Sequence, residues 1–110
     1  MSLVVLVTIP RKKAKFLAKK LLEKRLCACV NITNVESFFW WKDKIEEEKE
    51  SLLIIKTKEN IYPRLEKTIK TNHPYTVPEI IAIKIDKINK SYLQWLIGEV
   101  DANRNHSKYR

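Results

Sequence analysis

The residues of this chain that are best suited to chemistry are two closely spaced cysteines, Cys27 and Cys29. On a strand, side chains two positions apart share one face and lie about 6.6 Å apart along it. Thiolates select soft ions such as Cu(I), so this spacing predicts a soft-metal site, which stays weak without a further ligand. The alternative is that both are small buried hydrophobic side chains, because free cysteine is among the most buried residue types. A structural zinc site is not expected, since no second ligand pair follows the C-x-C spacing.

The two histidines are weaker candidates for a metal-binding or catalytic role. His73 directly precedes Pro74 at the predicted end of a helix, where the helix dipole favours a protonated imidazole. It is therefore either a helix cap or a metal or ligand contact in a cleft. His106 lies in a polar C-terminal stretch and is expected to be solvated. No Ser–His–Asp or Cys–His arrangement is recognisable, so the sequence does not predict an enzyme.

Composition limits the classes of protein that can carry these residues. A length of 110 residues predicts one domain, which we place at residues 1–102, followed by a polar tail at residues 103–110. Gly98 is the only glycine, which excludes a P-loop and a dinucleotide-binding fingerprint. No apolar run approaches the roughly 20 residues that span a bilayer, and the run at residues 3–7 is too short for the core of a signal peptide. We expect a cytoplasmic protein, or an exported one whose signal has been removed.

Hydrophobic periodicity predicts the elements that position the candidate residues. A β-branched run at residues 3–9 predicts a central buried strand, helical spacing predicts a helix over 11–25, and a β-prone stretch follows at 26–32. Residues 37–41 and 45–57 predict an antiparallel hairpin with its turn at Asp43. A helix at 61–72, a strand at 79–85 and a helix after Asn89 or Ser91 complete the chain. This order predicts a ferredoxin-like α/β sandwich, with a mixed or antiparallel sheet and helices on one face.

Four consecutive aromatic residues lie in the predicted hairpin: Phe38, Phe39, Trp40 and Trp41. Alternate side chains of a strand point to opposite faces, so both faces of this strand require cover. Helices can cover only one of them, and each aromatic side chain presents about 150–250 Å² of surface. We therefore predict that these four residues lie in a homo-oligomer interface.

The formal charge of +9 makes nucleic acid a partner to consider. RNA-recognition motifs share this strand order and stack bases on sheet aromatics. Their RNP1 pattern has glycines around its aromatics, however, and this chain has none there. The basic residues gather on the solvent side of the first predicted helix, which favours a solvated lysine-rich face. An RNA-binding domain is therefore the weakest of the functions considered.

Several motifs resemble, in order along the chain, those of the CutA family, the divalent-cation tolerance proteins. They are L-V-T at residues 6–8, R-L-C-A-C-V-N-I at 25–32, W-W at 40–41, L-I-I-K-T at 53–57, H-P-Y-T-V-P-E-I at 73–80 and Y-L-Q-W at 92–95. The resemblance runs from about Leu3 to Ile97, and the block that begins at His73 is its most specific part. It implies a ferredoxin-like homotrimer, similar in architecture to the PII signalling proteins, with a role in tolerance of copper and other divalent metals.

The resemblance also implies where a site would lie. It points to Cys29 of the A-C-V-N motif and His73 of the H-P-Y block as metal ligands. Cys27, which stands where the family commonly has alanine, is a weaker candidate that rests on its spacing from Cys29. The resemblance places five more residues in clefts between subunits: Lys56, Tyr75, Glu79, Tyr92 and Trp95. There Lys56 and Glu79 would hold an anion and a cation, or would pair with each other.

Two departures from the family pattern concern turns, because Asp43 and Ile88 stand where the family usually has glycine. Asp43 still tolerates a left-handed conformation. The predicted function is that of a divalent-cation tolerance protein without an organic cofactor, a homotrimer that binds a divalent metal, copper foremost. The alternatives are a PII-like signalling or scaffold trimer that binds a small ligand in its inter-subunit clefts, and the RNA-binding domain.

Overall fold

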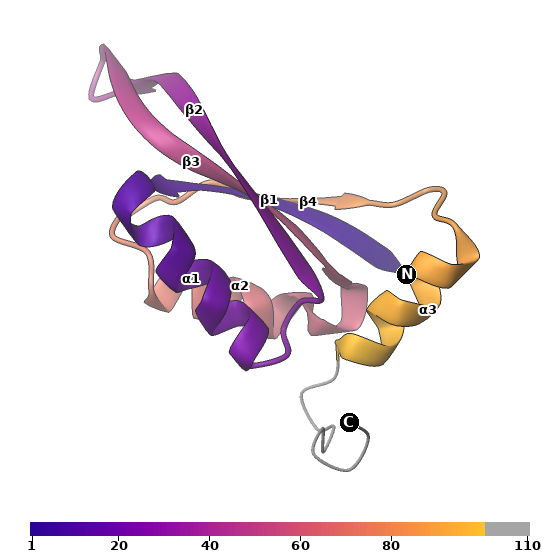
Figure 1. Ribbon diagram of the computed structural model, residues 1–110. Helices are drawn as coiled ribbons and strands as arrows, with labels where there is room; N and C mark the ends of the chain where they lie inside the picture. Colours follow the sequence, from indigo (N-terminus) through magenta and orange to yellow (C-terminus); the bar gives the residue numbers. More distant parts are fainter. Residues whose placement is uncertain (101–110) are drawn as a thin grey trace.

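The computed structural model describes residues 1–100, which form one four-stranded sheet with helices against one of its faces (Figure 1). The predicted polar tail at residues 103–110, with His106, lies outside the described residues. The elements are β1 (Ser2–Pro10), α1 (Arg11–Glu23), β2 (Cys29–Trp41), β3 (Lys44–Lys58), the 3₁₀ turn η1 (Glu59–Ile61), α2 (Tyr62–Thr71), β4 (Ile80–Lys84) and α3 (Lys90–Glu99).

The sheet has the strand order β2-β3-β1-β4, and every neighbouring pair is antiparallel. β1 therefore lies in the interior of the sheet, with Val5 opposite Ile55 of β3 on one side and Ala82 of β4 on the other. Each βαβ crossover skips one strand position, which is how two parallel strands and a helix pack together. The predicted ferredoxin-like fold is confirmed, with the antiparallel form of the sheet.

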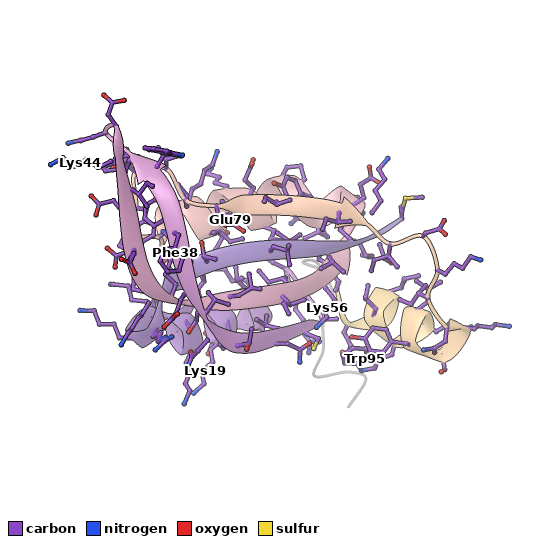
Figure 2. All side chains as sticks on the ribbon, turned by 90° about the horizontal axis from the view of Figure 1, so that it is seen from above. Lys19, Phe38, Lys44, Lys56, Glu79 and Trp95 are labelled. Atoms are coloured by element: carbon purple, nitrogen blue, oxygen red, sulfur yellow. The ribbon has the colours of Figure 1, made fainter. Side chains whose placement is uncertain are left out.

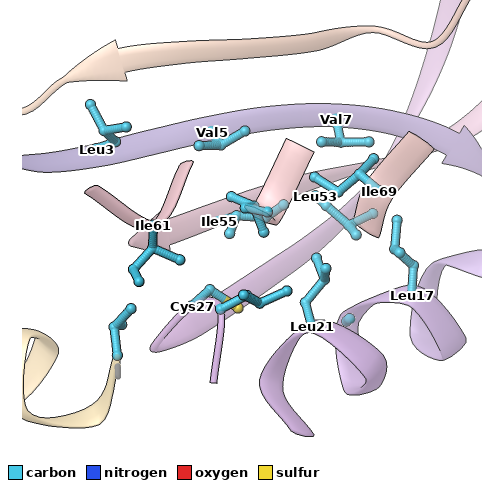
Figure 3. Packing of buried hydrophobic residues seen from close by; sticks show 14 of the residues in the cluster. Leu3, Val5, Val7, Leu17, Leu21, Cys27, Leu53, Ile55, Ile61 and Ile69 are labelled. Carbon is cyan, nitrogen blue, oxygen red and sulfur yellow. The ribbon is translucent and has the colours of Figure 1, made fainter. Parts of the chain in front are cut away.

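Alternation along β1 and β3 builds the core. Val5 and Val7 of β1 and Ile55 of β3 are completely buried on the face that α1 and α2 cover. Helical spacing brings Leu17 and Leu21 of α1 up against that face (Figure 3). α2 adds Leu65 and Ile69, also completely buried. Burying each such side chain stabilises the fold by about 1.5–3 kcal/mol, so this shared core fixes the position of the sheet on the helices.

The opposite face of the sheet is uncovered within residues 1–100, and its centre is aliphatic. We call it the open face; its central side chains are Val4, Leu6, Leu52, Ile54, Ile81 and Ile83. Ile81 and Ile83 on the edge strand β4 are 48% and 50% exposed. Figure 2 views the sheet from above, toward this face. Lys56 lies at one end of it and Glu79 toward the other.

The β2–β3 hairpin projects well beyond the other strands (Figure 1). β1 pairs with β3 only from Glu50 to Lys58, so the distal half of the hairpin pairs only with itself. Its turn is where the sequence predicts it: Lys42 and Asp43 have φ angles of 50° and 64°. Asparagine and aspartate are the non-glycine residues that best tolerate this left-handed region, which explains how Asp43 replaces a glycine. The aromatic residues lie on this projection, with Phe38 63% and Trp40 72% exposed.

Two local expectations are wrong. The predicted strand at residues 26–32 begins only at Cys29, because α1 ends in a Schellman motif. Leu26 N–H donates to the Leu21 carbonyl and Arg25 N–H to the Leu22 carbonyl, while Arg25 takes a left-handed φ of 57°. This turn directs Leu26 and Cys27 into the core instead of along a strand.

The second wrong expectation concerns α3. The helical spacing of Leu93, Leu96, Ile97 and Val100 predicts that these side chains share one face, but Ile97 is 48% exposed. α3 lies at one end of the sheet and packs mainly against β3, so only a narrow stripe of it is buried. Asn89 caps the helix with its side chain, as one of the two predicted starts requires. Ile88, where the family usually has glycine, packs against the core without a positive φ angle.

α1 presents a strongly basic face to solvent. The helix carries six Lys or Arg residues and a single Glu, and its cations lie mainly on the exposed side, as predicted. Among residues 1–100, none of these cations forms an ion pair with a carboxylate. Phe16 lies in the middle of this face, 57% exposed, with the Lys20 ammonium 5.5 Å from its ring centroid.

Candidate functional site

The predicted site residues fall into two groups at opposite ends of the open face. The first, which we call the thiol–amine cluster, contains Cys29, Asn31, Lys56, Tyr92 and Trp95. The second, which we call the His73 cluster, contains Thr8, Glu50, His73, Tyr75 and Glu79. The two are separated along β1: Lys56 pairs with Val4, whereas the His73 cluster is built on Thr8. Four residues of strand span about 13 Å.

Strand register assembles the thiol–amine cluster. Cys29 of β2 lies directly opposite Lys56 of β3, and Asn31 follows two positions later on the same face. The Lys56 ammonium donates to Cys29 Sγ at 3.7 Å and to Asn31 Oδ1. The Cys29 thiol lies 3.9 Å from the same Asn31 oxygen. The arrangement brings together one cation, one soft thiol and one neutral acceptor.

α3 contributes two aromatic rings to this cluster. Asn89 Oδ1 accepts the Tyr92 N–H at 2.9 Å, which fixes the start of the helix and the direction of its first turn. The rings of Tyr92 and Trp95 lie 5.3 Å apart at 48°. Partial burial raises the pKa of Tyr92, and the neighbouring Cys29 thiol raises it further. Trp95 is 45% exposed, and Figure 2 shows it near Lys56 at this end of the sheet.

A shallow hollow of about 470 Å³ adjoins the cluster. Trp95 lines it together with the backbone turn at Cys27 and Ala28 and the end of α1. Arg25 and Glu99 also line it, and Arg25 donates to the Glu99 carboxylate at 2.9 Å. The charge of Arg25 is therefore balanced by a carboxylate. Lys56, in contrast, forms no ion pair within residues 1–100.

Cys27 and Cys29 occupy different environments, so the predicted shared strand face is wrong. Cys27 is 2% exposed in the core, and burial, helped by the neighbouring Cys29, raises its pKa to about 12, against a lowering effect of Lys56. Only the thiolate is a nucleophile or a good metal ligand. Cys27 thus behaves as a buried hydrophobic side chain, while Cys29 is partly exposed on the open face.

We expect N-ethylmaleimide to modify Cys29 and to leave Cys27 unmodified in the folded protein. Burial and the raised pKa together should make Cys27 roughly 100-fold slower or more. Tandem mass spectrometry separates the two sites, because Ala28 lies between them. Denatured protein is the control and should react at both cysteines. Equal modification of both in the folded protein would contradict the assignment of Cys27 to the core.

The His73 ring has both of its nitrogens engaged. Nε2 lies 2.7 Å from the Thr8 carbonyl oxygen, and Nδ1 accepts the Tyr75 N–H at 3.1 Å. A carbonyl can only accept and an amide N–H can only donate, so the ring is neutral with its proton on Nε2. It joins the loop after α2 to β1, instead of capping α2 as a protonated imidazole. A metal at His73 would have to replace one of these two bonds.

Tyr75 and Glu50 complete this end. The Tyr75 hydroxyl donates to Glu50 Oε2 at 2.9 Å, and Glu50 is only 3% exposed. Burial, followed by the hydrogen bond and charge of Glu50, raises the pKa of Tyr75 to about 12. Glu79 accepts from the Thr8 hydroxyl at 3.5 Å. Lys56 and Glu79 therefore do not pair with each other within one chain.

Sequence reasoning missed Asn31 and Glu50. Asn31 belongs to the motif that contains Cys29, and its place two positions after Cys29, on the same face of the strand, is the signal that could have identified it. Glu50 ends the alternating series Glu46, Glu48 and Glu50, a pattern typical of the exposed side of a strand, yet it is buried. No three His, Cys, Asp or Glu side chains of residues 1–100 lie close enough together to hold a metal ion. Within the same range, every helix falls short of the length and hydropathy that a bilayer crossing demands.

Comparison with known proteins gives a consistent result. Residues 3–99 match the family model described as CutA1 divalent ion tolerance protein. The divalent-cation tolerance protein CutA of Pyrococcus horikoshii is 45% identical over 98 residues, which cover 88% of this chain and 96% of that protein. The solved structure of the periplasmic divalent cation tolerance protein CutA from Archaeoglobus fulgidus has a TM-score of 0.90 at 40% identity, covering 92% of this chain and 100% of that one. The PII-like protein CutA from Nostoc, in apo form, has a TM-score of 0.87 at 30% identity, covering 93% and 99%.

Proposed function

The chain belongs to the CutA1 family of divalent ion tolerance proteins, as its motifs predicted, and from that premise we propose that it binds copper through Cys29 as a homotrimer. Its relatives are named divalent-cation tolerance proteins, and this general function is the one shared across the family. The proposal of a copper site rests on the different environments of the two cysteines. Cys27 is locked in the core, while Cys29 is free and partly exposed beside polar groups.

The donors available in one chain suit a soft ion only in part. Cys29 offers a thiolate, the ligand that Cu(I) prefers, and Asn31 Oδ1 lies 3.9 Å from its sulfur. The Lys56 ammonium, 3.7 Å from the same sulfur, opposes any cation. A closed copper site therefore needs a second donor from another copy of the chain, and copper must turn Lys56 away when it binds. His73, the other proposed ligand, would have to give up one of its two hydrogen bonds.

Two exposed apolar surfaces support the homotrimer. The open face carries six aliphatic side chains that no helix of residues 1–100 covers. The projecting hairpin exposes Phe38 and Trp40 on one side, while Phe39 and Trp41, 38% and 43% exposed, lie on the other. Contiguous apolar surface of this kind marks an interface in most proteins. We assign both surfaces to contacts among three copies, with the two clusters lining the clefts between them.

We also propose that the protein binds without catalysing a reaction and that it works in the cytoplasm. The binding role is supported by the contacts of the polar groups in both clusters. Tyr75, His73 and Asn31 are engaged as hydrogen-bonding partners of neighbouring groups rather than as a nucleophile and its base. The location is supported by the two thiols, which are both free.

Titration of the reduced protein with Cu(I), in competition with a chromophoric chelator, tests the copper site. We expect a saturable site that is lost in Cys29→Ser and kept in Cys27→Ala, the matched control two residues away. Lys56→Gln should tighten binding by about fivefold or more, because a unit charge about 4 Å away is worth about 1 kcal/mol even in water. An unchanged isotherm in Cys29→Ser would remove Cys29 from the proposal.

A specific observation favours a second candidate function, the binding of a small ligand in the cleft. Among residues 1–100, the Lys56 ammonium donates to two uncharged groups, the Cys29 sulfur and the Asn31 amide oxygen, and it lies near a tryptophan that is 45% exposed. Ligand sites typically combine aromatic side chains with a small number of polar or charged groups that orient the ligand. The two candidates share Cys29 and Lys56 but require opposite behaviour from Lys56.

A further inference from the structure

We propose that the thiol–amine cluster binds a small planar aromatic monoanion, such as an aromatic carboxylate. Lys56 would hold the anionic group, and the Tyr92–Trp95 pair would contact the ring. This inference deepens the small-ligand candidate and rests on it. It names the chemical class of ligand and the group that anchors it.

The positive charge of Lys56 selects an anionic ligand. Its ammonium donates to Cys29 Sγ and Asn31 Oδ1, and no carboxylate of residues 1–100 lies within ion-pair distance of it. Neither the Cys29 thiol nor the Asn31 amide oxygen carries the formal negative charge that would balance the ammonium. A carboxylate that reaches Lys56 would supply that charge in a hydrogen bond between two ionised groups. Cys29 and Asn31 hold the amine in place until then.

Two aromatic rings lie beside this amine and provide a surface for the ring of the ligand. Tyr92 and Trp95 lie on the first turns of α3, which Asn89 caps, so their rings are held at a defined position. Trp95 leaves 45% of its surface exposed and lines the adjoining hollow. Aromatic rings pair with each other at centroid distances of about 4.5–7 Å in offset or tilted arrangements. A third ring can therefore join the existing pair.

The number of unpaired cations near the site limits the charge of the ligand. Arg25, a cation that lines the adjoining hollow, is already paired with Glu99. One uncompensated amine matches one negative charge, which favours a monoanion over a polyphosphate. A cationic ligand would be repelled by Lys56. A neutral aromatic molecule would leave the amine with only its present partners, which carry no opposite charge.

The experiment uses 2-naphthoate as the probe and follows its binding to the full chain by NMR. The indole N–H signal of Trp95, identified by its absence in Trp95→Phe, should shift in a saturable way. We expect Lys56→Gln to weaken binding by about tenfold or more. Lys58→Gln is the matched control, because it removes the same charge from the same face of β3 and should change binding less than about twofold.

Two analogues separate the charge of the ligand from its ring. The neutral 2-naphthylmethanol and the non-planar cyclohexanecarboxylate should each bind at least about fivefold more weakly than 2-naphthoate. Equal binding of the neutral analogue, no change in Lys56→Gln, or no saturable shift of Trp95 would each overturn the inference. A Cu(I) titration of the same samples distinguishes the two levels. If copper binds at Cys29 but 2-naphthoate does not bind, the inference fails and the proposed copper function stands.

Discussion

Replacing Ile54 with glutamate is expected to reduce the particle in solution from three chains to one. Ile54 lies at the centre of the open face, between Leu6 of β1 and Asn31 of β2, and is partly exposed in a single chain. The isolated chain should therefore keep its fold. In an assembly that covers the open face, the new carboxylate would be buried without a partner, at a cost of several kcal/mol. Light scattering should give a mass three times 13.1 kDa for the parent and 13.1 kDa for the variant.

Phe16→Glu provides the matched control for this experiment. It introduces the same charge in place of an apolar side chain, at a position on α1 that is 57% exposed. Because α1 lies on the other side of the sheet, this variant should keep the mass of the parent. Circular dichroism of both variants should match the parent spectrum. A variant at Ile54 that stays at three chains would exclude the open face as the interface, and a parent protein of 13.1 kDa would exclude the trimer.

Above pH 9, the folded chain is expected to lose stability because of Cys27. The pKa of this thiol is about 12 in the folded protein, against an ordinary value of 9.0. Below pH 9 both states hold the proton. Between pH 9 and 12 the unfolded state releases a proton that the folded state keeps, so the free energy of unfolding falls as pH rises. The slope from this one group reaches about 1.4 kcal/mol per pH unit.

Denaturant unfolding of the parent and of Cys27→Ala, at several pH values from 8 to 11, measures this effect. Loss of the thiol should lower the stability by a constant amount at neutral pH and should flatten the alkaline decline. Tyr75, whose pKa is also raised to about 12, contributes a decline of the same sign in both proteins and so cancels in the comparison. Parallel curves for Cys27→Ala and the parent would contradict the raised pKa of Cys27.

Local sequence pattern predicts most of the fold because the pattern and the packing agree. The alternation in β1 and the helical spacing of Leu17 and Leu21 each identify the buried side without any tertiary knowledge. Two predictions about β2 fail: the stretches at 26–32 and 37–41 form one continuous strand, and this strand starts later than predicted because of Arg25. Its left-handed conformation has no signature in a residue of that type, and it displaces the start of β2 to Cys29.

The candidate site was less predictable, because it depends on register. The motifs supplied Lys56 and Glu79. Only the strand pairing of Lys56 with Val4 and the hydrogen bond from Thr8 to Glu79 show that these two residues lie at opposite ends of the sheet. Glu50 continues an alternating series of glutamates that is typical of the exposed side of a strand, but its side chain is buried. Its burial depends on where β1 ends, since Pro10 pairs with it directly, and no local pattern in β3 reports this.

In concentrated solution, copies of this chain meet through surfaces of unequal charge. The helical face carries six cations of α1 against one carboxylate, and none of these cations is neutralised by an ion pair within residues 1–100. Two such faces repel each other over a Debye length of about 10 Å at 0.1 M salt and about 3 Å at 1 M. The unpaired lysines therefore act as a colloidal stabiliser. They keep separate particles dispersed at low ionic strength, while the apolar open face is free to associate.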